Sequence, residues 1–185
     1  MTPFTLIQKL KNRIKISGQN NKILVDDNKT LKISKTKIVI KGSNNTLHIK
    51  SGVKINSSFI EIVGNNCSIT IGKNSIIGDG CYLSAKEENI KLCIGDECML
   101  SRNAKLMTSD GHPIYQDGMI INSAKNITLG DKVWIADDVT VLKGVEVGAN
   151  SVVGIGSILT KSIPSGSVAV GNPAKVVKDG ISWEH

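Results

Sequence analysis

The feature that most constrains this chain is a six-residue period in its second half. From Leu129 to Thr160, branched apolar residues recur at every sixth position, namely Leu129, Ile135, Val141, Val147, Val153 and Leu159. This spacing matches neither the 3.6-residue period of a helix nor the alternation of a strand. Such a short repeat predicts a solenoid, because one turn cannot bury its own apolar face and must stack on the next.

The composition agrees with a narrow aliphatic interior. Aromatic residues make up only 3% of the 185 residues, and there are 18 glycines. If three hexapeptides close one triangular coil of about 18 residues, the branched side chains stack on those of the next coil at roughly 4.8 Å. We therefore predict an all-β protein built as a parallel β-helix over residues 17–170.

The first part of this solenoid is less regular. A pattern of apolar residues, Gly and Asn recurs after 22 residues, so that Ile38, Ile40, Gly42, Asn44, Leu47 and Ile49 match Ile60, Ile62, Gly64, Asn66, Ile69 and Ile71. Apolar alternation separated by Gly and Asn indicates strand, turn and strand. We interpret these segments as irregular coils of the same prism.

Residues 107–126 interrupt the repeat, which restarts at Ile127. We expect this segment to leave the prism as an extruded loop, and long loops in compact domains are usually functional. It contains His112, whose imidazole suits proton transfer near neutral pH. A loop histidine alone is more often a surface residue, but its place on the extruded loop favours a catalytic role. Asp110 either orients His112 or simply forms the turn before Gly111.

The two ends of the chain are expected to differ from the prism. Residues 1–16 mix apolar and basic residues at a spacing typical of a short amphipathic helix. We favour a role in capping the open first coil over weak docking to a membrane surface. Residues 171–185 form a C-terminal tail.

The net charge and the cysteines indicate which binding partners and which cellular compartment to expect. The net charge of +7 fits nucleic acid, anionic lipid or a polyanionic small ligand, but the sequence shows no base-reading helix and no aromatic stacking platform. No signal peptide or 18-residue apolar span is evident, so we expect a cytoplasmic location. The four cysteines lack paired C-x-x-C spacing and are interpreted as small apolar residues in a reducing compartment: Cys67, Cys81, Cys93 and Cys98.

The motifs of this sequence occur in an order that resembles a known enzyme family. The hexapeptide repeat, the His112-Pro113 pair on a loop, the segment 130–135 and the segment 171–175 together resemble the acetyl-CoA dependent O-acetyltransferases of bacterial surface polysaccharides, and more widely the galactoside, maltose and xenobiotic acetyltransferases. The resemblance covers roughly residues 71–178. It implies a left-handed parallel β-helix, acetyl-CoA as co-substrate, and a homotrimer with active sites between subunits.

The resemblance also implies roles for individual residues. His112 would be the general base, and Trp134 would form a wall of the acetyl or acceptor pocket. The amide of Ala136 would help to stabilise an oxyanion. Ala136, Gly154 and Gly156 would receive the pantetheine arm of CoA, because they are small and would have unpaired amides. Lys161 and Lys175 would meet the phosphates of CoA. The turn at Asn172 and Pro173 would bring Lys175 to the site.

The acceptor pocket is less constrained. Its candidate contacts are Ser84, Lys86, Arg102 and Tyr115, and Lys86 with Arg102 would suit an acidic sugar. Three functions stay open: an O-acetyltransferase of glycans, which we favour, an N-acetyltransferase of amino sugars or antibiotics, and an inactive scaffold. The γ-class carbonic anhydrases share the prism but need three histidines around zinc, and the fold offers only His48 and His112, so we expect no metal.

Overall fold

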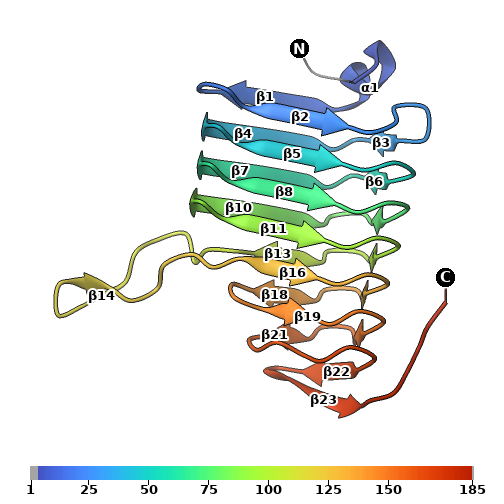
Figure 1. Cartoon of the computed structure of the whole chain (residues 1–185), viewed down its shortest axis with the longest axis vertical. Helices are drawn as coiled ribbons and strands as arrows, with labels where there is room; N and C mark the ends of the chain where they lie inside the picture. Colours follow the sequence, from blue (N-terminus) through green and yellow to red (C-terminus); the bar gives the residue numbers. More distant parts are fainter. Residues whose placement is uncertain (1–3, 185) are drawn as a thin grey trace.

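Short strands separated by bends wind residues 4–184, the part described by this computed structural model, into a triangular solenoid (Figure 1). The first face is a seven-stranded sheet of β1 (Arg13–Ser17), β4 (Lys37–Ser43), β7 (Phe59–Asn65), β10 (Tyr82–Glu88), β13 (Lys105–Met107), β18 (Thr140–Leu142) and β21 (Ile158–Leu159). The second is a six-stranded sheet of β2 (Lys22–Val25), β5 (Thr46–Ile49), β8 (Ser68–Ile71), β11 (Lys91–Ile94), β16 (Ile127–Leu129) and β19 (Glu146–Val147).

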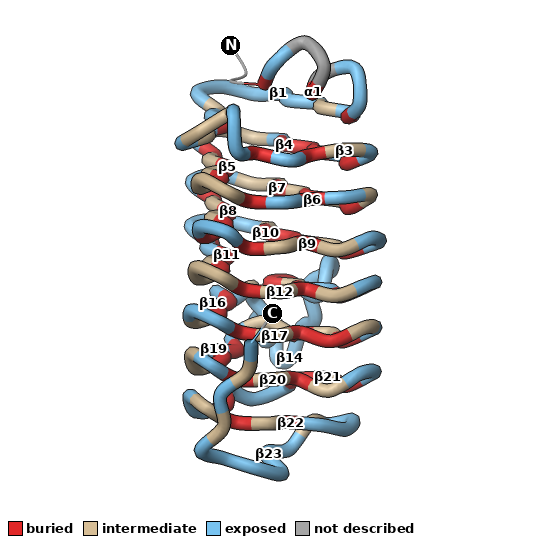
Figure 2. The backbone as a smooth tube through the Cα atoms, turned by 90° about the vertical axis from the view of Figure 1, so that its right-hand side faces the viewer, coloured by how far each residue is buried: buried red, intermediate tan, exposed pale blue. Residues whose placement is uncertain are grey.

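The third face is an eight-stranded sheet, seen from the front in Figure 2. Its strands are β3 (Lys32–Ser34), β6 (Lys54–Asn56), β9 (Ile76–Ile77), β12 (Met99–Leu100), β17 (Trp134–Ile135), β20 (Val152–Val153), β22 (Val168–Gly171) and β23 (Ala174–Lys178). All pairs in the three faces are parallel except β22 with β23.

The prism is left-handed. In Figure 1 the strands β4 and β7 run to the left behind the axis, whereas β5 and β8 run to the right in front of it, while the chain descends from coil to coil. The predicted all-β, left-handed parallel β-helix is therefore confirmed, including the irregular early coils. None of the helices in residues 4–184 is long and apolar enough to cross a membrane.

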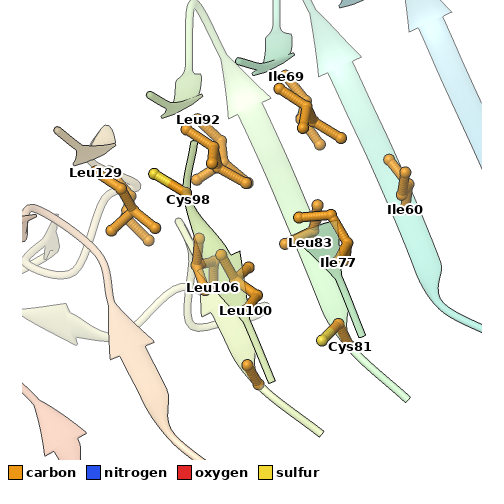
Figure 3. Packing of buried hydrophobic residues seen from close by; sticks show 14 of the residues in the cluster. Ile60, Ile69, Ile77, Cys81, Leu83, Leu92, Cys98, Leu100, Leu106 and Leu129 are labelled. Carbon is orange, nitrogen blue, oxygen red and sulfur yellow. The ribbon is translucent and has the colours of Figure 1, made fainter. Parts of the chain in front are cut away.

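Columns of aliphatic side chains fill the interior. On the first face the column runs in register through Ile38, Ile60, Leu83, Leu106, Val141 and Leu159, each fully buried. Figure 3 shows how Ile60, Leu83 and Leu106 stack along the axis. Full burial of such a side chain contributes about 1.5–3 kcal/mol, so the stacked coils stabilise each other.

The N-terminal cap is shorter than expected. Helix α1 (Leu6–Lys11) begins with a capping box between Thr5 and Gln8, and Asn12 ends it. The solenoid already starts at Arg13, because β1 pairs in register with β4. The helix nevertheless lies over the first coil, where Phe4 is buried in the core. Residues 1–3 of the expected cap lie outside the described residues.

The C-terminal tail starts as a hairpin. Strands β22 and β23 pair antiparallel around a cis Asn172–Pro173 bond. The chain then turns back, so that the ring of Trp183 lies 5.8 Å from that of Trp134, centroid to centroid. This hairpin covers the last coil, and the final residues cover part of the third face.

Candidate functional site

The extruded loop leaves the prism at the corner between the first and second faces. Strand β13 ends at Met107 and β16 starts at Ile127, so the segment outside the prism covers residues 108–126, one residue fewer than the predicted 107–126. The loop folds as a small antiparallel hairpin of β14 (Tyr115–Gln116) and β15 (Met119–Ile120) that projects away from the axis (Figure 1). The apolar side chains at its tip are exposed, including Met119 at 69%.

Glu87 fastens both ends of this loop to the coil above. Its carboxylate accepts a hydrogen bond from Ser109 Oγ at 2.7 Å, on the outgoing side, and one from the amide of Ala124 at 2.9 Å, on the returning side. Buried Thr108 adds two bonds, since its Oγ1 accepts from the Lys86 amide and its carbonyl accepts from the Lys125 amide. Glu87 was not predicted from the sequence, because it lies in a polar segment, residues 86–91, where the six-residue repeat is irregular and carries no motif.

Asn122 holds the histidine segment from the other side of the loop. Its side-chain amide donates to the carbonyl of His112 and to Asp110 Oδ2, both at 2.9 Å, and its Oδ1 accepts from the Ile114 amide at 2.6 Å. Lys143, from the coil below, donates to Asp110 Oδ2 at 2.5 Å. These bonds fix the backbone that carries His112.

Of the two roles considered for Asp110, the structure favours the one in the turn, because among residues 4–184 its carboxylate is hydrogen-bonded to Asn122 and Lys143 and not to the imidazole of His112. These bonds lower the pKa of the Asp110 carboxyl below its ordinary 3.8. The reason for this arrangement is the turn at Gly111, whose amide donates to Ser109 Oγ. Asp110 therefore braces the loop through Asn122 rather than orienting the ring directly.

A cavity of about 400 Å³ opens beside His112 at the root of the loop. Its lining combines the imidazole-bearing segment, two charged residues of β10 and an apolar patch: Val63, Lys86, Glu87, Ser109, Gly111, His112, Pro113, Ile120, Asn122 and Ser123. A similar cavity of about 460 Å³ lies against α1 and the first coils of the third face. Of these two cavities, only the one beside His112 combines a histidine with the polar groups that an acceptor needs.

Lys86 is held in place at the cavity by Glu61. The Lys86 ammonium lies 2.9 Å from Glu61 Oε2, which also accepts a hydrogen bond from the Tyr82 hydroxyl at 2.6 Å. Burial raises the pKa of Glu61, but the bonds from Tyr82 and Lys86 outweigh it and leave the pKa below 4.5. Lys86 is therefore a positioned cation at the edge of the cavity, where its ammonium is paired with Glu61.

Of the four predicted acceptor contacts, Lys86 is the one that lines this cavity within residues 4–184. Ser84 is buried in β10, and Tyr115 lies exposed on β14. Arg102 lies at the corner between the third and first faces, where its Nε donates to Asp137 Oδ2 at 3.0 Å. The expected pairing of Lys86 with Arg102 is thus not formed within one chain.

Trp134 is also distant from the loop. It lies on β17 of the third face, where its Nε1 donates to Ser101 Oγ at 3.1 Å. Figures 1 and 2 place β17 and the loop hairpin on opposite sides of the prism. One chain therefore does not bring His112 and Trp134 together.

The prediction of unpaired amides was wrong. The amides of Ala136, Gly154 and Gly156 donate to the carbonyls of Val153, Ala169 and Asp137, at 2.9–3.0 Å. The parallel ladder continues through these bends, so the Ala136 amide is already used and is not free for an oxyanion.

The other predicted cofactor residues are spread over two corners and the end of the prism. A side chain at Gly154 would meet Val170 at 2.6 Å, whereas Gly156 faces open space. Lys161 and Lys175 are exposed, and Asn172 with Pro173 forms the turn of the last hairpin.

Comparison with known proteins supports one family. The crystal structure of the polySia specific acetyltransferase NeuO is 31% identical, covers 96% of this chain and 90% of its own, and superposes with a TM-score of 0.79. This chain belongs to the hexapeptide-repeat acetyltransferases. No protein-family model matches the sequence of this acetyltransferase family member.

Two curated relatives agree with this membership. Polysialic acid O-acetyltransferase of Escherichia coli O1:K1 is 36% identical over 139 residues, and its counterpart of Neisseria meningitidis is 36% identical over 134 residues. These alignments cover 74% and 71% of this chain. The chain spans 44% and 60% of the length of these two relatives.

Proposed function

We propose that this acetyltransferase moves an acetyl group from acetyl-CoA to a hydroxyl of an acidic sugar in a glycan. The cavity that joins His112 to Lys86 is the observation that carries this proposal. An ammonium beside the base suits an acceptor carboxylate, and the relatives named above act on polysialic acid by their names. We also propose the cytoplasm as its compartment, where acetyl-CoA is made.

His112 would work as general base. Its imidazole takes the proton of the acceptor hydroxyl while the oxygen attacks the thioester carbon and a C–O bond forms. When the tetrahedral oxyanion collapses, the C–S bond breaks, and the imidazolium returns the proton to the leaving thiolate. Asn122 and Glu87 contribute by holding the loop that carries His112.

We further propose that the site is completed by a second copy in a homotrimer. His112 and Trp134 lie on opposite sides of one prism, so a cyclic assembly would place the loop of one subunit against the third face of the next. The exposed apolar tip of the loop supports such a contact, with Ile114 at 53% and Ile121 at 56% exposure. Trp134 of the neighbouring copy would then form a wall of the acetyl pocket.

CoA would bind along the corner between the third and first faces. The bends at Ala136, Gly154 and Gly156 are low in side-chain bulk, and the open space at Gly156 leaves room for the pantetheine arm, whereas Val170 fills the space at Gly154. Lys161 and Lys175 would meet the phosphates as point charges. The turn at Asn172 and Pro173 would position Lys175.

Thiol release from acetyl-CoA tests the proposal. Wild type is assayed with sialylated, uronic, amino and neutral glycans, alongside His112→Ala and the control His48→Ala, whose imidazole binds Asp26 on the second face. We expect release with acidic glycans and a loss of at least about 100-fold in His112→Ala alone. Equal turnover of neutral and acidic glycans, or full activity of His112→Ala, would refute it.

A further inference from the structure

The positive charge of this chain is concentrated at one end. Residues 1–60 contain 12 of the 23 Lys and Arg residues but only two of the 16 Asp and Glu residues, so they carry +10 and the remaining residues −3. The first coils are therefore strongly cationic, whereas the coils below the loop are slightly acidic. This separation along the axis creates a field that favours polyanions at the N-terminal end.

Four of these cations project from the first face. Arg13 and Lys15 on β1, and Lys37 and Lys41 on β4, are all exposed. No carboxylate within residues 4–184 forms an ion pair with any of them. We call these four residues the basic face. Unpaired cations on adjacent strands lie close enough to act together on one extended anion.

The basic face is continuous with the cavity beside His112. Lys41 pairs in register with Val63, and Val63 pairs with Lys86, and both Val63 and Lys86 line the cavity. With strands about 4.8 Å apart, the row from β10 to β1 spans about 14 Å. A chain that leaves the cavity across the first face would therefore meet Lys41, Lys37 and the residues of β1 in turn.

A neighbouring column adds flat apolar surface. Phe59 and Tyr82 stack with their ring centroids 5.3 Å apart, and the Lys37 ammonium lies 4.4 Å above the Phe59 ring. Phe59 pairs in register with Lys37 on one side and with Tyr82 on the other, and both rings are half-buried. Partly exposed rings flanked by cations suit a pyranose ring that carries a carboxylate.

We infer that the basic face is an extended subsite for an acidic polymeric glycan, which binds across β4 and β1 while one of its residues occupies the cavity at His112. This inference rests on the proposed function for the sugar residue that reacts at His112. Binding of the rest of the glycan to the basic face does not depend on that function. Its consequence is a preference for long acceptors, since short ones fill the cavity without reaching Lys37 on β4 or the cations of β1. Salt should weaken the binding of long acceptors more than the binding of short ones.

The test uses the full-length protein with Arg13, Lys15, Lys37 and Lys41 all changed to Gln. The matched control changes Lys22, Lys29, Lys32 and Lys54 to Gln, four exposed lysines of the same coils on or between the second and third faces. We expect KM for long polysialic acid to rise roughly tenfold in the first variant only, with KM for monomeric sialic acid and for acetyl-CoA unchanged. Light scattering checks that the assembly keeps its mass.

Direct binding separates this inference from the proposed function. The His112→Ala protein, with and without the four Gln substitutions of the basic face, is titrated with long polysialic acid, duplex DNA and anionic vesicles. Loss of polysialic acid binding in the protein with the substituted basic face supports the inference even if no acetyl transfer is found. Unchanged binding and KM, or a loss that is equal for DNA or vesicles, would overturn it.

Discussion

Lys143 donates a hydrogen bond from Nζ to Asp110 Oδ2 at 2.5 Å and thereby ties the coil below the loop to the loop itself. The Lys143 side chain is only 17% exposed and also donates to the carbonyl of Asn122. A single lysine thus fixes two of the residues that hold the backbone of His112.

Replacing Lys143 by Met should impair acetyl transfer more than folding. Because the Asp110 side chain is 42% exposed, solvent screens the ion pair in part, and we expect a loss of stability of about 1 kcal/mol. Release of Asp110 and Asn122 should let the histidine segment shift, and kcat should fall roughly tenfold. Amide exchange across residues 108–124 should accelerate. The control is Lys50→Met, which breaks a comparable pair with Asp96; an equal loss of kcat there would contradict this role.

Glu61→Gln should make stability less dependent on pH. The pKa of Glu61 is lowered in the folded protein, so its contribution is complete above the unfolded value of 4.5 and is lost as the pH falls through the folded value. We expect a loss of up to about 1 kcal/mol at pH 7, a smaller loss at pH 4, and none once the pH lies below the folded pKa of Glu61. Thermal melts across this pH range check this, with exposed Glu88→Gln as control. A difference that persists below the folded pKa would refute it.

Gly64 is required where β7 passes the root of the loop. Its φ is +139°, and a Cβ there would lie 1.6 Å from the carbonyl oxygen of Glu87. Gly64→Ala should therefore cost more than about 2 kcal/mol and displace Glu87. Gly118→Ala at the loop tip, with φ +78° and no atom within 4 Å, should cost about 1 kcal/mol. Equal denaturant midpoints for the two variants would be inconsistent with this geometry.

The buried thiols should resist modification in the folded protein. Burial raises the pKa of Cys81 and of Cys98 to about 11, and it also raises that of Cys67. At pH 8 a thiol-reactive disulfide should therefore label Cys93 at most, because it alone is partly exposed among the four cysteines. Cys93→Ser should remove this labelling, and denaturant should expose the remaining three thiols. Rapid native labelling of Cys81 would contradict the packing.

The sequence was sufficient to predict the prism and the place where the loop leaves it, to within one residue. Each coil places one inward residue on each of its three faces, so the six-residue period appears directly in the sequence, as from Leu129 to Ile135 to Val141. The loop shows as the place where this period stops. The end of α1 was less predictable, since Ile14 fits both a helical stripe and an inward strand position, and pairing with β4 decides in favour of the strand.

The site was predicted only in part, because its geometry depends on pairs formed between coils. Arg102 is bound by Asp137, 35 residues away, and the amide of Ala136 by Val153 of the next coil. Glu87 clamps the loop through Ser109, a contact that no local motif reveals. His112 and Lys86 share a cavity, as proposed from their residue types.

A subunit-mixing experiment tests the central claim most directly. His112→Ala and Trp134→Ala proteins are purified separately, then unfolded and refolded together, and acetyl transfer to polysialic acid is measured. If His112 of one subunit and Trp134 of its neighbour form each site, random trimers regain about a quarter of wild-type activity. If the mixture stays as inactive as either protein alone, the site does not combine these two residues across a subunit contact, and the account is wrong.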